Sequence, residues 1–168
     1  MITPDSVAIP VAVLAERGPA TSPWAEFVWR AVDVLEDAPD TAPWTVLREN
    51  DGRTLFLAGR AEVWLHPTDT DNYKHNLEAA SPRIWVVLRP VESAPGMALQ
   101  CVTVDAGEAH LYADSGADLL ESLPMPNFLR EPTENFVARH HQERGFFKRK
   151  RDRADPEVMA RRTRGEEE

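Results

Sequence analysis

Cysteine is almost absent from this sequence, which has Cys101 as its single thiol in 168 residues. One thiol cannot form a disulfide within the chain, and it cannot complete a multi-cysteine zinc or iron–sulfur site. No apolar run approaches the ~20 residues that a membrane-spanning helix needs. The N-terminus also lacks the basic and apolar segments of a secretory signal. We therefore expect a cytoplasmic protein without a membrane segment.

Glycine is sparse and scattered, with eight residues that form no cluster. Phosphate-binding loops need clustered glycines that open onto a helix, so that backbone amides can approach the anion. Gly59 stands alone inside a segment that has the alternation of a strand. The missing nucleotide motif argues against a nucleotidyltransferase or a kinase.

Residues for catalysis or metal binding are not brought together by their spacing. The sequence has no Gly-x-Ser-x-Gly motif, and Cys101 lies inside a predicted strand, where cysteine is usually an inert packing residue. His140 and His141 are adjacent, and neighbours on a helix point about 100° apart, so both imidazoles do not easily reach one ion. We predict no catalytic residues, no metal and no cofactor.

Charge is distributed unevenly along the chain. The formal net charge of -9 opposes nonspecific nucleic-acid binding by the body of the protein. Two aromatic residues and four cations stand together near the C-terminus: Phe146, Phe147, Lys148, Arg149, Lys150 and Arg151. Either the phenylalanines attach the last helix to the body and the cations keep the tail in water, or this segment docks an acidic partner or a nucleic acid. We predict one domain over residues 1–147 and a charged, mobile tail over residues 148–168.

Alternation of apolar and polar residues predicts seven strands. They cover residues 7–15, 28–36, 44–48, 53–66, 83–89, 98–104 and 117–123. Pro10 would place the first strand at a sheet edge, where a missing amide donor is tolerated. Residues 28–36 also satisfy the helical period in part, but their β-branched and aromatic content favours a strand. Asn50-Asp51-Gly52 predicts a tight hairpin turn.

Three helices are predicted among these strands. The first starts at Asp69 or Thr70, and the second follows Asp105, whose spacing to Glu108 matches a capping box. The last helix is predicted to start at Pro132 or Thr133. Because no regular βαβ alternation is present, we predict an α+β fold with a mainly antiparallel sheet, two short helices and a C-terminal helix.

The strands on either side of residues 67–81 each have an aliphatic face and a mixed face, and we expect them in the middle of one sheet. The mixed face combines aromatic and charged side chains: Phe56, Arg60, Glu62, Trp64, Arg83, Trp85 and Arg89. Tryptophan and arginine are enriched among residues that anchor protein interfaces. This face is therefore a candidate partner site, and the alternative is that the final helix covers it. Trp24 and Trp44, which follow prolines in loops, are either hydrophobic plugs or contact points.

Several phrases within residues 7–153 carry a family resemblance. They include Ile9-Pro10-Val11-Ala12-Val13, Ser81-Pro82-Arg83-Ile84-Trp85, Pro124-Met125-Pro126 and the run from Phe136-Val137 through His140-His141 to Arg151. In these phrases the chain resembles a small bacterial family of unknown function found beside formate dehydrogenase genes. Its members are often labelled as similar to molybdopterin-guanine dinucleotide biosynthesis protein A. Enzymes of that type carry a Leu-Ala-Gly-Gly loop, whereas Leu14-Ala15 is followed here by Glu16-Arg17-Gly18.

The resemblance implies an association with formate dehydrogenase. Our leading hypothesis is a non-catalytic accessory protein of a molybdenum- or tungsten-dependent formate dehydrogenase, or of its maturation, that works by binding a protein partner. The contact residues would be Trp64, Trp85, Arg60, Arg83, Arg89 and the segment from Phe146 to Arg151. One alternative is a protein that binds the molybdenum cofactor, with the same three arginines gripping the pterin phosphate. Another is a nucleic-acid adaptor that acts through the basic tail.

Overall fold

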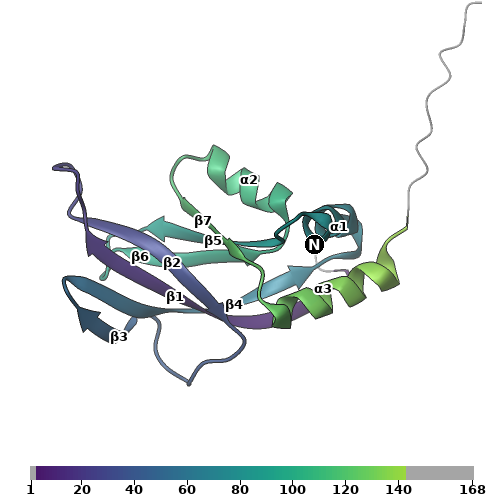
Figure 1. Ribbon diagram of the computed structural model, residues 1–168, viewed down its shortest axis with the longest axis horizontal. Helices are drawn as coiled ribbons and strands as arrows, with labels where there is room; N and C mark the ends of the chain where they lie inside the picture. Colours follow the sequence, from purple (N-terminus) through teal and green to yellow (C-terminus); the bar gives the residue numbers. More distant parts are fainter. Residues whose placement is uncertain (1–2, 143–168) are drawn as a thin grey trace, which may run out of the picture.

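The computed structural model describes residues 3–142, and within them the chain forms two antiparallel sheets and three α-helices (Figure 1). The elements are β1 (Val7–Pro19), β2 (Phe27–Leu35), β3 (Thr45–Asn50), β4 (Arg53–Leu65), a 3-10 turn η1 (Pro67–Asp69), α1 (Thr70–Glu78), β5 (Arg83–Pro90), β6 (Met97–Thr103), α2 (Ala106–Asp114), β7 (Leu119–Pro124) and α3 (Asn127–His140). This arrangement confirms the predicted α+β fold with a C-terminal helix. None of the helices in this part of the chain has the length and apolar character that crossing a bilayer requires.

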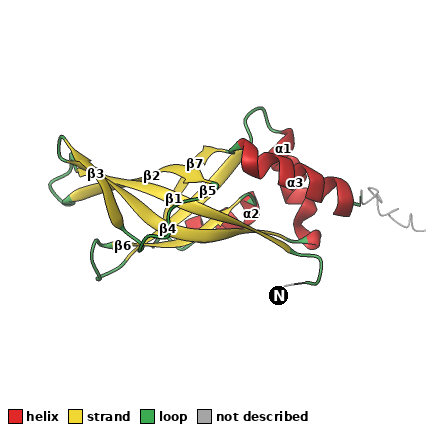
Figure 2. Cartoon of the chain, turned by 90° about the horizontal axis from the view of Figure 1, so that it is seen from below, coloured by secondary structure: helices red, strands yellow, loops and turns green. Residues whose placement is uncertain are grey.

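The strands that flank α1 belong to different sheets. The first sheet has the order β2-β1-β4-β3 and the second has the order β6-β5-β7. β4 and β5 are each an inner strand of their own sheet, so the prediction that they share the middle of one sheet is wrong. The segment between them, η1 and α1, carries the chain from one sheet to the other. Figure 2 shows α1 and α3 side by side at one end of the two sheets.

The core lies between the aliphatic faces of the two sheets. Fully buried residues come from β1, β4, β5 and the position directly after β6: Val13, Val63, Leu65, Ile84, Val86, Leu88 and Val104. Tyr73 of α1 and Leu129 and Phe136 of α3 close the core at the helical end. The remaining helix, α2, lies on the outward face of the second sheet, where Val87 is completely buried (Figure 1).

A bulge in β4 changes which side chains point inward. Val13 of β1 pairs with Gly59, while the next residue, Leu14, pairs with Leu57, so Ala58 has no partner in β1. Phe56 therefore faces inward, and it is only 3% exposed. Strict alternation predicted Phe56 on the mixed face, and this prediction is wrong because one extra residue reverses the phase of the strand. Leu55 and Leu57, which were expected on the aliphatic face, instead share the outward face with Arg60, Glu62 and Trp64.

Two further predictions, the place of the first strand in its sheet and the start of the last helix, differ from the structure. β1 is an inner strand, not an edge strand, but its pairing with β2 begins only at Ala12, so Pro10 lies where β4 is the sole neighbour. The last helix begins at Asn127 instead of Pro132, because the carbonyl of Pro126 already accepts the amides of Leu129 and Arg130. The predicted hairpin turn before β4 is confirmed, with Asp51 at φ 52° and Gly52 at φ 77°.

Candidate functional site

A pocket of about 400 Å³ lies where β4 approaches β6. Among the described strands, β3 pairs only with residues 53–57 of β4, which leaves the rest of that edge without a ladder partner. β6 pairs with β5 alone. The β4–β6 pocket lies along these two open edges, and α2 contributes to its wall. Its lining residues are Arg60, Ala61, Glu62, Trp64, His66, Leu99, Gln100, Cys101, Val102, Glu108 and Tyr112.

The β4 wall of the pocket presents alternate residues of one strand face. The guanidinium of Arg60 donates to the carbonyl of Ala38 at 2.6 Å, which holds its charge toward the loop before β3. The rings of Trp64 and His66 are parallel, with their centroids 5.9 Å apart and an interplanar angle of 2°. Glu62, between Arg60 and Trp64, makes no hydrogen bond or ion pair with any other residue from 3 to 142. The wall thus offers one uncompensated carboxylate beside an aromatic ring.

The opposite wall comes from β6 and α2. Asp105 caps α2 by accepting from the amide of Gly107 at 2.8 Å, as its spacing predicts. The Glu108 carboxylate does not complete the capping box, because it reaches the strand instead. It accepts from the hydroxyl of Thr103 at 2.8 Å and from the thiol of Cys101 at 3.4 Å.

The surroundings of two pocket residues, Cys101 and Tyr112, weaken their acidity. Burial, and then the neighbouring charge of Glu108, raise the pKa of the Cys101 thiol to about 12. Burial likewise raises the pKa of the Tyr112 phenol. Neither group is ionised at neutral pH, so neither is an activated nucleophile or base. In residues 3–142 there is also no cluster of His, Cys, Asp and Glu with the geometry to hold a metal ion.

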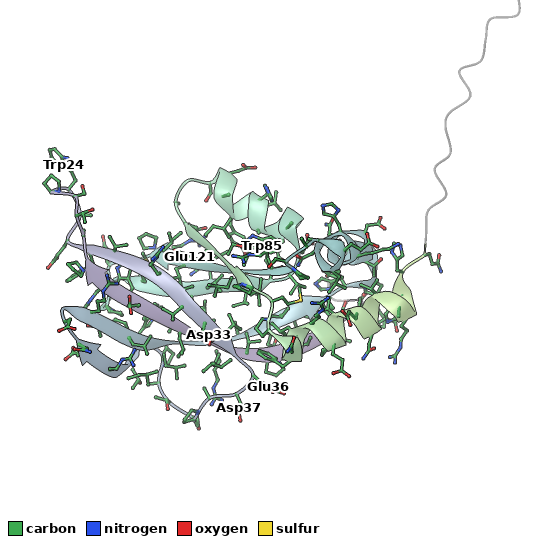
Figure 3. All side chains as sticks on the ribbon, in the orientation of Figure 1. Trp24, Asp33, Glu36, Asp37, Trp85 and Glu121 are labelled. Atoms are coloured by element: carbon green, nitrogen blue, oxygen red, sulfur yellow. The ribbon has the colours of Figure 1, made fainter. Side chains whose placement is uncertain are left out.

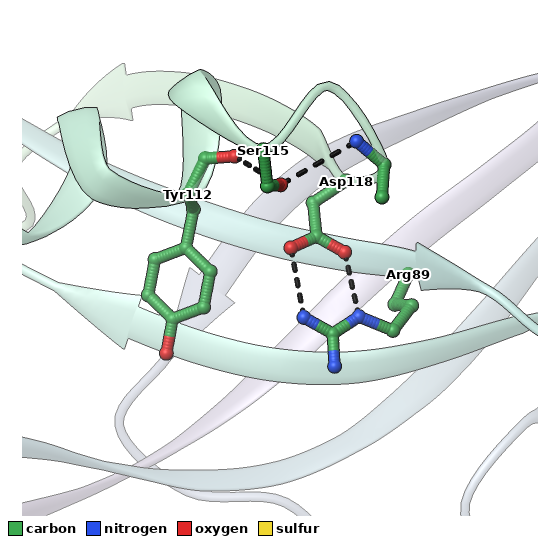
Figure 4. A network of polar contacts seen from close by, with 5 residues as sticks. Arg89, Tyr112, Ser115 and Asp118 are labelled. Carbon is green, nitrogen blue, oxygen red and sulfur yellow. Dashed lines mark hydrogen bonds and ion pairs between the residues drawn. The ribbon is translucent and has the colours of Figure 1, made fainter.

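The second sheet carries the other predicted contact residues. Trp85 is half-buried on the outward face of β5, beside α2 (Figure 3). Arg83 donates to the hydroxyl and the carbonyl of Ser122, each at 2.8 Å. Arg89 forms two hydrogen bonds with the carboxylate of Asp118, at 2.7 and 2.9 Å (Figure 4). This pairing holds the pKa of Asp118 below its usual value.

The two arginines of β5 cannot grip one phosphate. Arg83 and Arg89 are six residues apart, which is roughly 20 Å along a strand, and Arg60 belongs to the other sheet. All three guanidinium groups already have acceptors within the fold. The geometry therefore gives no support to a pterin-phosphate clamp built from these arginines.

The predicted mixed face is divided between the two sheets. Trp64 and Arg60 lie on β4, whereas Trp85 lies on β5, which is not paired with β4. The final helix does not cover these residues as one continuous face, because α3 packs beside α1 at the end of the sheets (Figure 2). The aromatic and basic segment from Phe146 to Arg151 lies outside the described residues.

The adjacent histidines at the end of α3 point to different neighbours. The ring of His140 packs on Phe136, with centroids 4.5 Å apart. His141 places its Nδ1 3.2 Å from the hydroxyl of Thr70 and 3.4 Å from a carboxylate oxygen of Asp71. The His141 contacts attach the end of α3 to the start of α1, whereas the His140 contact lies within α3.

The two loop tryptophans have opposite environments. Trp44 is a plug: its ring meets Trp29 and Phe56 edge-on at 5.6 and 5.7 Å. Trp24 is 93% exposed at the tip of the β1–β2 hairpin, which projects from the body (Figure 3). Phe27, three residues further along the chain, is 38% exposed. The sequence offered both roles for these residues, and only burial distinguishes them.

The hairpin that carries Trp24 is held by its own backbone. β1 and β2 pair as far as Pro19 and Phe27. Beyond them, the amide of Ala20 donates to the carbonyl of Glu26 at 3.4 Å. The amide of Trp24 itself donates to the hydroxyl of Ser22 at 3.2 Å. The indole is therefore presented on a hydrogen-bonded loop.

Comparison with known proteins gives a family match. A family model described as "Protein of unknown function (DUF3305)" matches residues 10–151. No curated protein and no solved structure matches the chain. The matched range includes the whole hairpin tip and both walls of the β4–β6 pocket.

Proposed function

The chain belongs to this family of proteins of unknown function, and we propose that it acts without catalysis, by binding a protein partner through the tip of the β1–β2 hairpin. The observation that carries the proposal is the exposure of Trp24, whose side chain contributes nothing to the protein's own core. An indole in water is unfavourable, and tryptophan is one of the residue types enriched among the anchors of protein interfaces.

The surroundings of Trp24 support a contact surface over a chance exposure. Phe27 and Val28 at the start of β2 are 38% and 46% exposed. As consecutive strand residues they lie on opposite faces of the hairpin, so each face carries one apolar side chain next to the tip. The guanidinium of Arg17 lies 4.4 Å from the centroid of Phe27, and this stacking holds the ring in place. A contact surface that is already ordered loses little conformational entropy on binding.

The charge of the body favours a basic partner. Residues 1–142 contain 10 Lys and Arg against 21 Asp and Glu, a formal net charge of -11. Opposite charge speeds the encounter of two proteins, while like charge slows it. The partner surface we propose therefore combines an apolar pocket for the indole with positively charged surroundings.

For the identity of the partner, we propose a subunit of a molybdenum- or tungsten-dependent formate dehydrogenase, or a factor in its maturation, met in the cytoplasm. The support for this choice of partner is the sequence resemblance described above. The protonated state of Cys101 and Tyr112 in the pocket supports binding in preference to turnover.

Affinity capture from a lysate of the native organism tests this proposal. The bait is the full chain, and proteins bound to the wild type, to Trp24→Ala and to Thr21→Ala are quantified by mass spectrometry. Thr21 is an exposed residue of the same loop and serves as the matched control. We expect a formate dehydrogenase subunit or maturation factor with the wild type and Thr21→Ala, and its loss with Trp24→Ala. Equal recovery with all three baits would remove the hairpin from the proposal, and recovery of no such protein would remove the partner.

A further inference from the structure

We propose that the β4–β6 pocket receives a planar guanidinium group, supplied by an arginine side chain of the protein partner. The choice of source rests on the proposed function, whereas the chemistry of the pocket does not. Four features of the pocket carry the inference. They are a slot beside Trp64, the carboxylate of Glu62 without a partner among the described residues, the carboxylate of Glu108 on the opposite wall, and the cation of Arg60, which is hydrogen-bonded outside the slot.

The slot follows from the spacing of side chains along β4. Residues two apart on one face of a strand are about 6.7 Å from each other. His66 covers one face of the Trp64 indole, and Glu62 is the next residue on the other side of it. A flat group in van der Waals contact with the indole lies about 3.5 Å from it, so this spacing leaves room for a single planar group between Trp64 and Glu62.

The charge of the walls selects a cation for this slot. Glu62 has no partner among the described residues. Glu108, on the opposite wall, accepts one hydrogen bond at each carboxylate oxygen and so has lone pairs left for a further donor. The one cation of the walls, Arg60, donates to the carbonyl of Ala38 instead of pairing with either glutamate. A bound cation would compensate charges that the fold leaves open.

The shape and size of the pocket favour guanidinium over ammonium. Guanidinium is planar, stacks on aromatic rings and presents five donors in a fixed fork, whereas ammonium is compact and strongly hydrated. The pocket volume of about 400 Å³ lies within the ~300–1,000 Å³ typical of ligand sites. It has room for the aliphatic stem of an arginine as well as its head group.

Titration with two matched probes tests the chemistry of the pocket on the purified full chain. N-acetyl-arginine amide carries the guanidinium, and N-acetyl-citrulline amide is its uncharged counterpart of the same shape. Binding is followed by the indole N–H signals in a two-dimensional NMR spectrum. We expect the Trp64 signal to shift with the arginine probe at millimolar concentration and not with citrulline. Equal shifts with both probes, or tighter binding of butylamine than of the arginine probe, would overturn the assignment.

The variant Glu62→Gln locates the site, because Glu62 is exposed and its replacement breaks no contact within the fold. We expect it to weaken the arginine probe about fivefold, as removal of a partly exposed ion pair does. Glu49→Gln, an exposed control on β3, is expected to bind like the wild type, and equal thermal denaturation of all three proteins confirms their fold. Unchanged probe affinity in Glu62→Gln would refute the site.

Capture of the partner separates the source of the guanidinium from the proposed function. Trp24→Ala is expected to bind the arginine probe normally, because the hairpin does not line the pocket. Glu62→Gln is expected to recover less of the partner from the lysate. If Glu62→Gln binds the probe about fivefold more weakly but recovers the partner in full, the partner's arginine is the wrong source, while the hairpin proposal stands.

Discussion

Replacement of Trp24 by alanine tests binding separately from folding. In the free protein the side chain is 93% exposed, so it makes almost no contact that folding depends on. Substitutions at such positions usually change the free energy of unfolding by less than about 0.5 kcal/mol. We expect the denaturation midpoint of Trp24→Ala to match that of the wild type.

The effect on binding is expected to be large because nearly the whole indole is available to a partner. A tryptophan buries about 200 Å², which at roughly 25 cal/mol per Å² gives an upper bound of about 5 kcal/mol. Incomplete burial and ordering of the partner reduce this amount. We expect a loss of at least ~2 kcal/mol, typical of an interface anchor, and hence about a 30-fold rise in the dissociation constant.

Biolayer interferometry with the captured partner measures this change, with Thr21→Ala as the control from the same loop. The off-rate should carry most of the difference, as it does for most interface substitutions. A dissociation constant for Trp24→Ala within twofold of the wild type would refute the anchoring role of the hairpin. Loss of binding accompanied by a lower denaturation midpoint would instead show that the indole supports the fold, which contradicts its exposure.

Three further predictions test the fold and the pocket. Gly59 has φ 152°, and a Cβ there would meet its nearest neighbours at 3.8 Å, so Gly59→Ala should lower the free energy of unfolding by about 1–3 kcal/mol through backbone strain and not through collision. In the same urea titration, Gly18→Ala should unfold like the wild type, because Gly18 has an ordinary φ and a Cβ there would meet its neighbours from 3.5 Å. The buried side-chain amide of Asn76 donates to the carbonyls of Arg83 and Val104 and accepts from the amide of Arg83. Asn76→Ala should therefore lower the free energy of unfolding by about 3 kcal/mol, and a loss of less than about 1 kcal/mol would contradict a stabilising role for these three hydrogen bonds. Because burial and Glu108 raise the pKa of Cys101 to about 12, its thiol should stay protonated at pH 8 and react with iodoacetamide at least a hundredfold more slowly than a free thiol; reaction at the rate of an unfolded control would show that the thiol is not shielded.

Most helices and strands could be predicted from the sequence because their formation depends mainly on the residues within each element. Alternation locates β2 and β5, and Asp51-Gly52 fixes the turn before β4, since positive φ at both positions is a local property. The phase of β4 could not be predicted, because the bulge at Ala58 becomes visible only when β1 is paired with it. Gly59 was the one available signal, since a lone glycine inside a strand often marks a bulge.

Sheet membership was hidden for a different reason. The aliphatic faces of β4 and β5 are alike in composition, so pairing them with each other or packing them across a core satisfies the same pattern. The choice is made by η1 and α1, whose buried Tyr73 and Asn76 attach the crossing segment to both sheets. Nothing in the alternation of either strand reports that contact.

The candidate pocket was half predicted. Arg60, Glu62 and Trp64 were found because they alternate on one short stretch of chain. The other wall was missed because Cys101 and Glu108 come from a segment about 40 residues away in sequence. Glu108 was assigned to a helix cap by its spacing, and only the structure shows that its carboxylate turns to Thr103 and Cys101.

The hairpin tip and the β4–β6 pocket lie at opposite ends of β1, which limits the kind of partner that touches both. Trp64 pairs across from Ala8, and the hairpin begins beyond Pro19. Eleven residues of strand separate these positions, which is roughly 35 Å. A standard interface buries about 800 Å² on each side, equivalent to a disc roughly 30 Å across. A partner that fills the pocket and also holds Trp24 must therefore follow the long axis of the first sheet, with either a large face or an extended segment. Because the two contacts are far apart and share no residues, their contributions to affinity should be independent of one another.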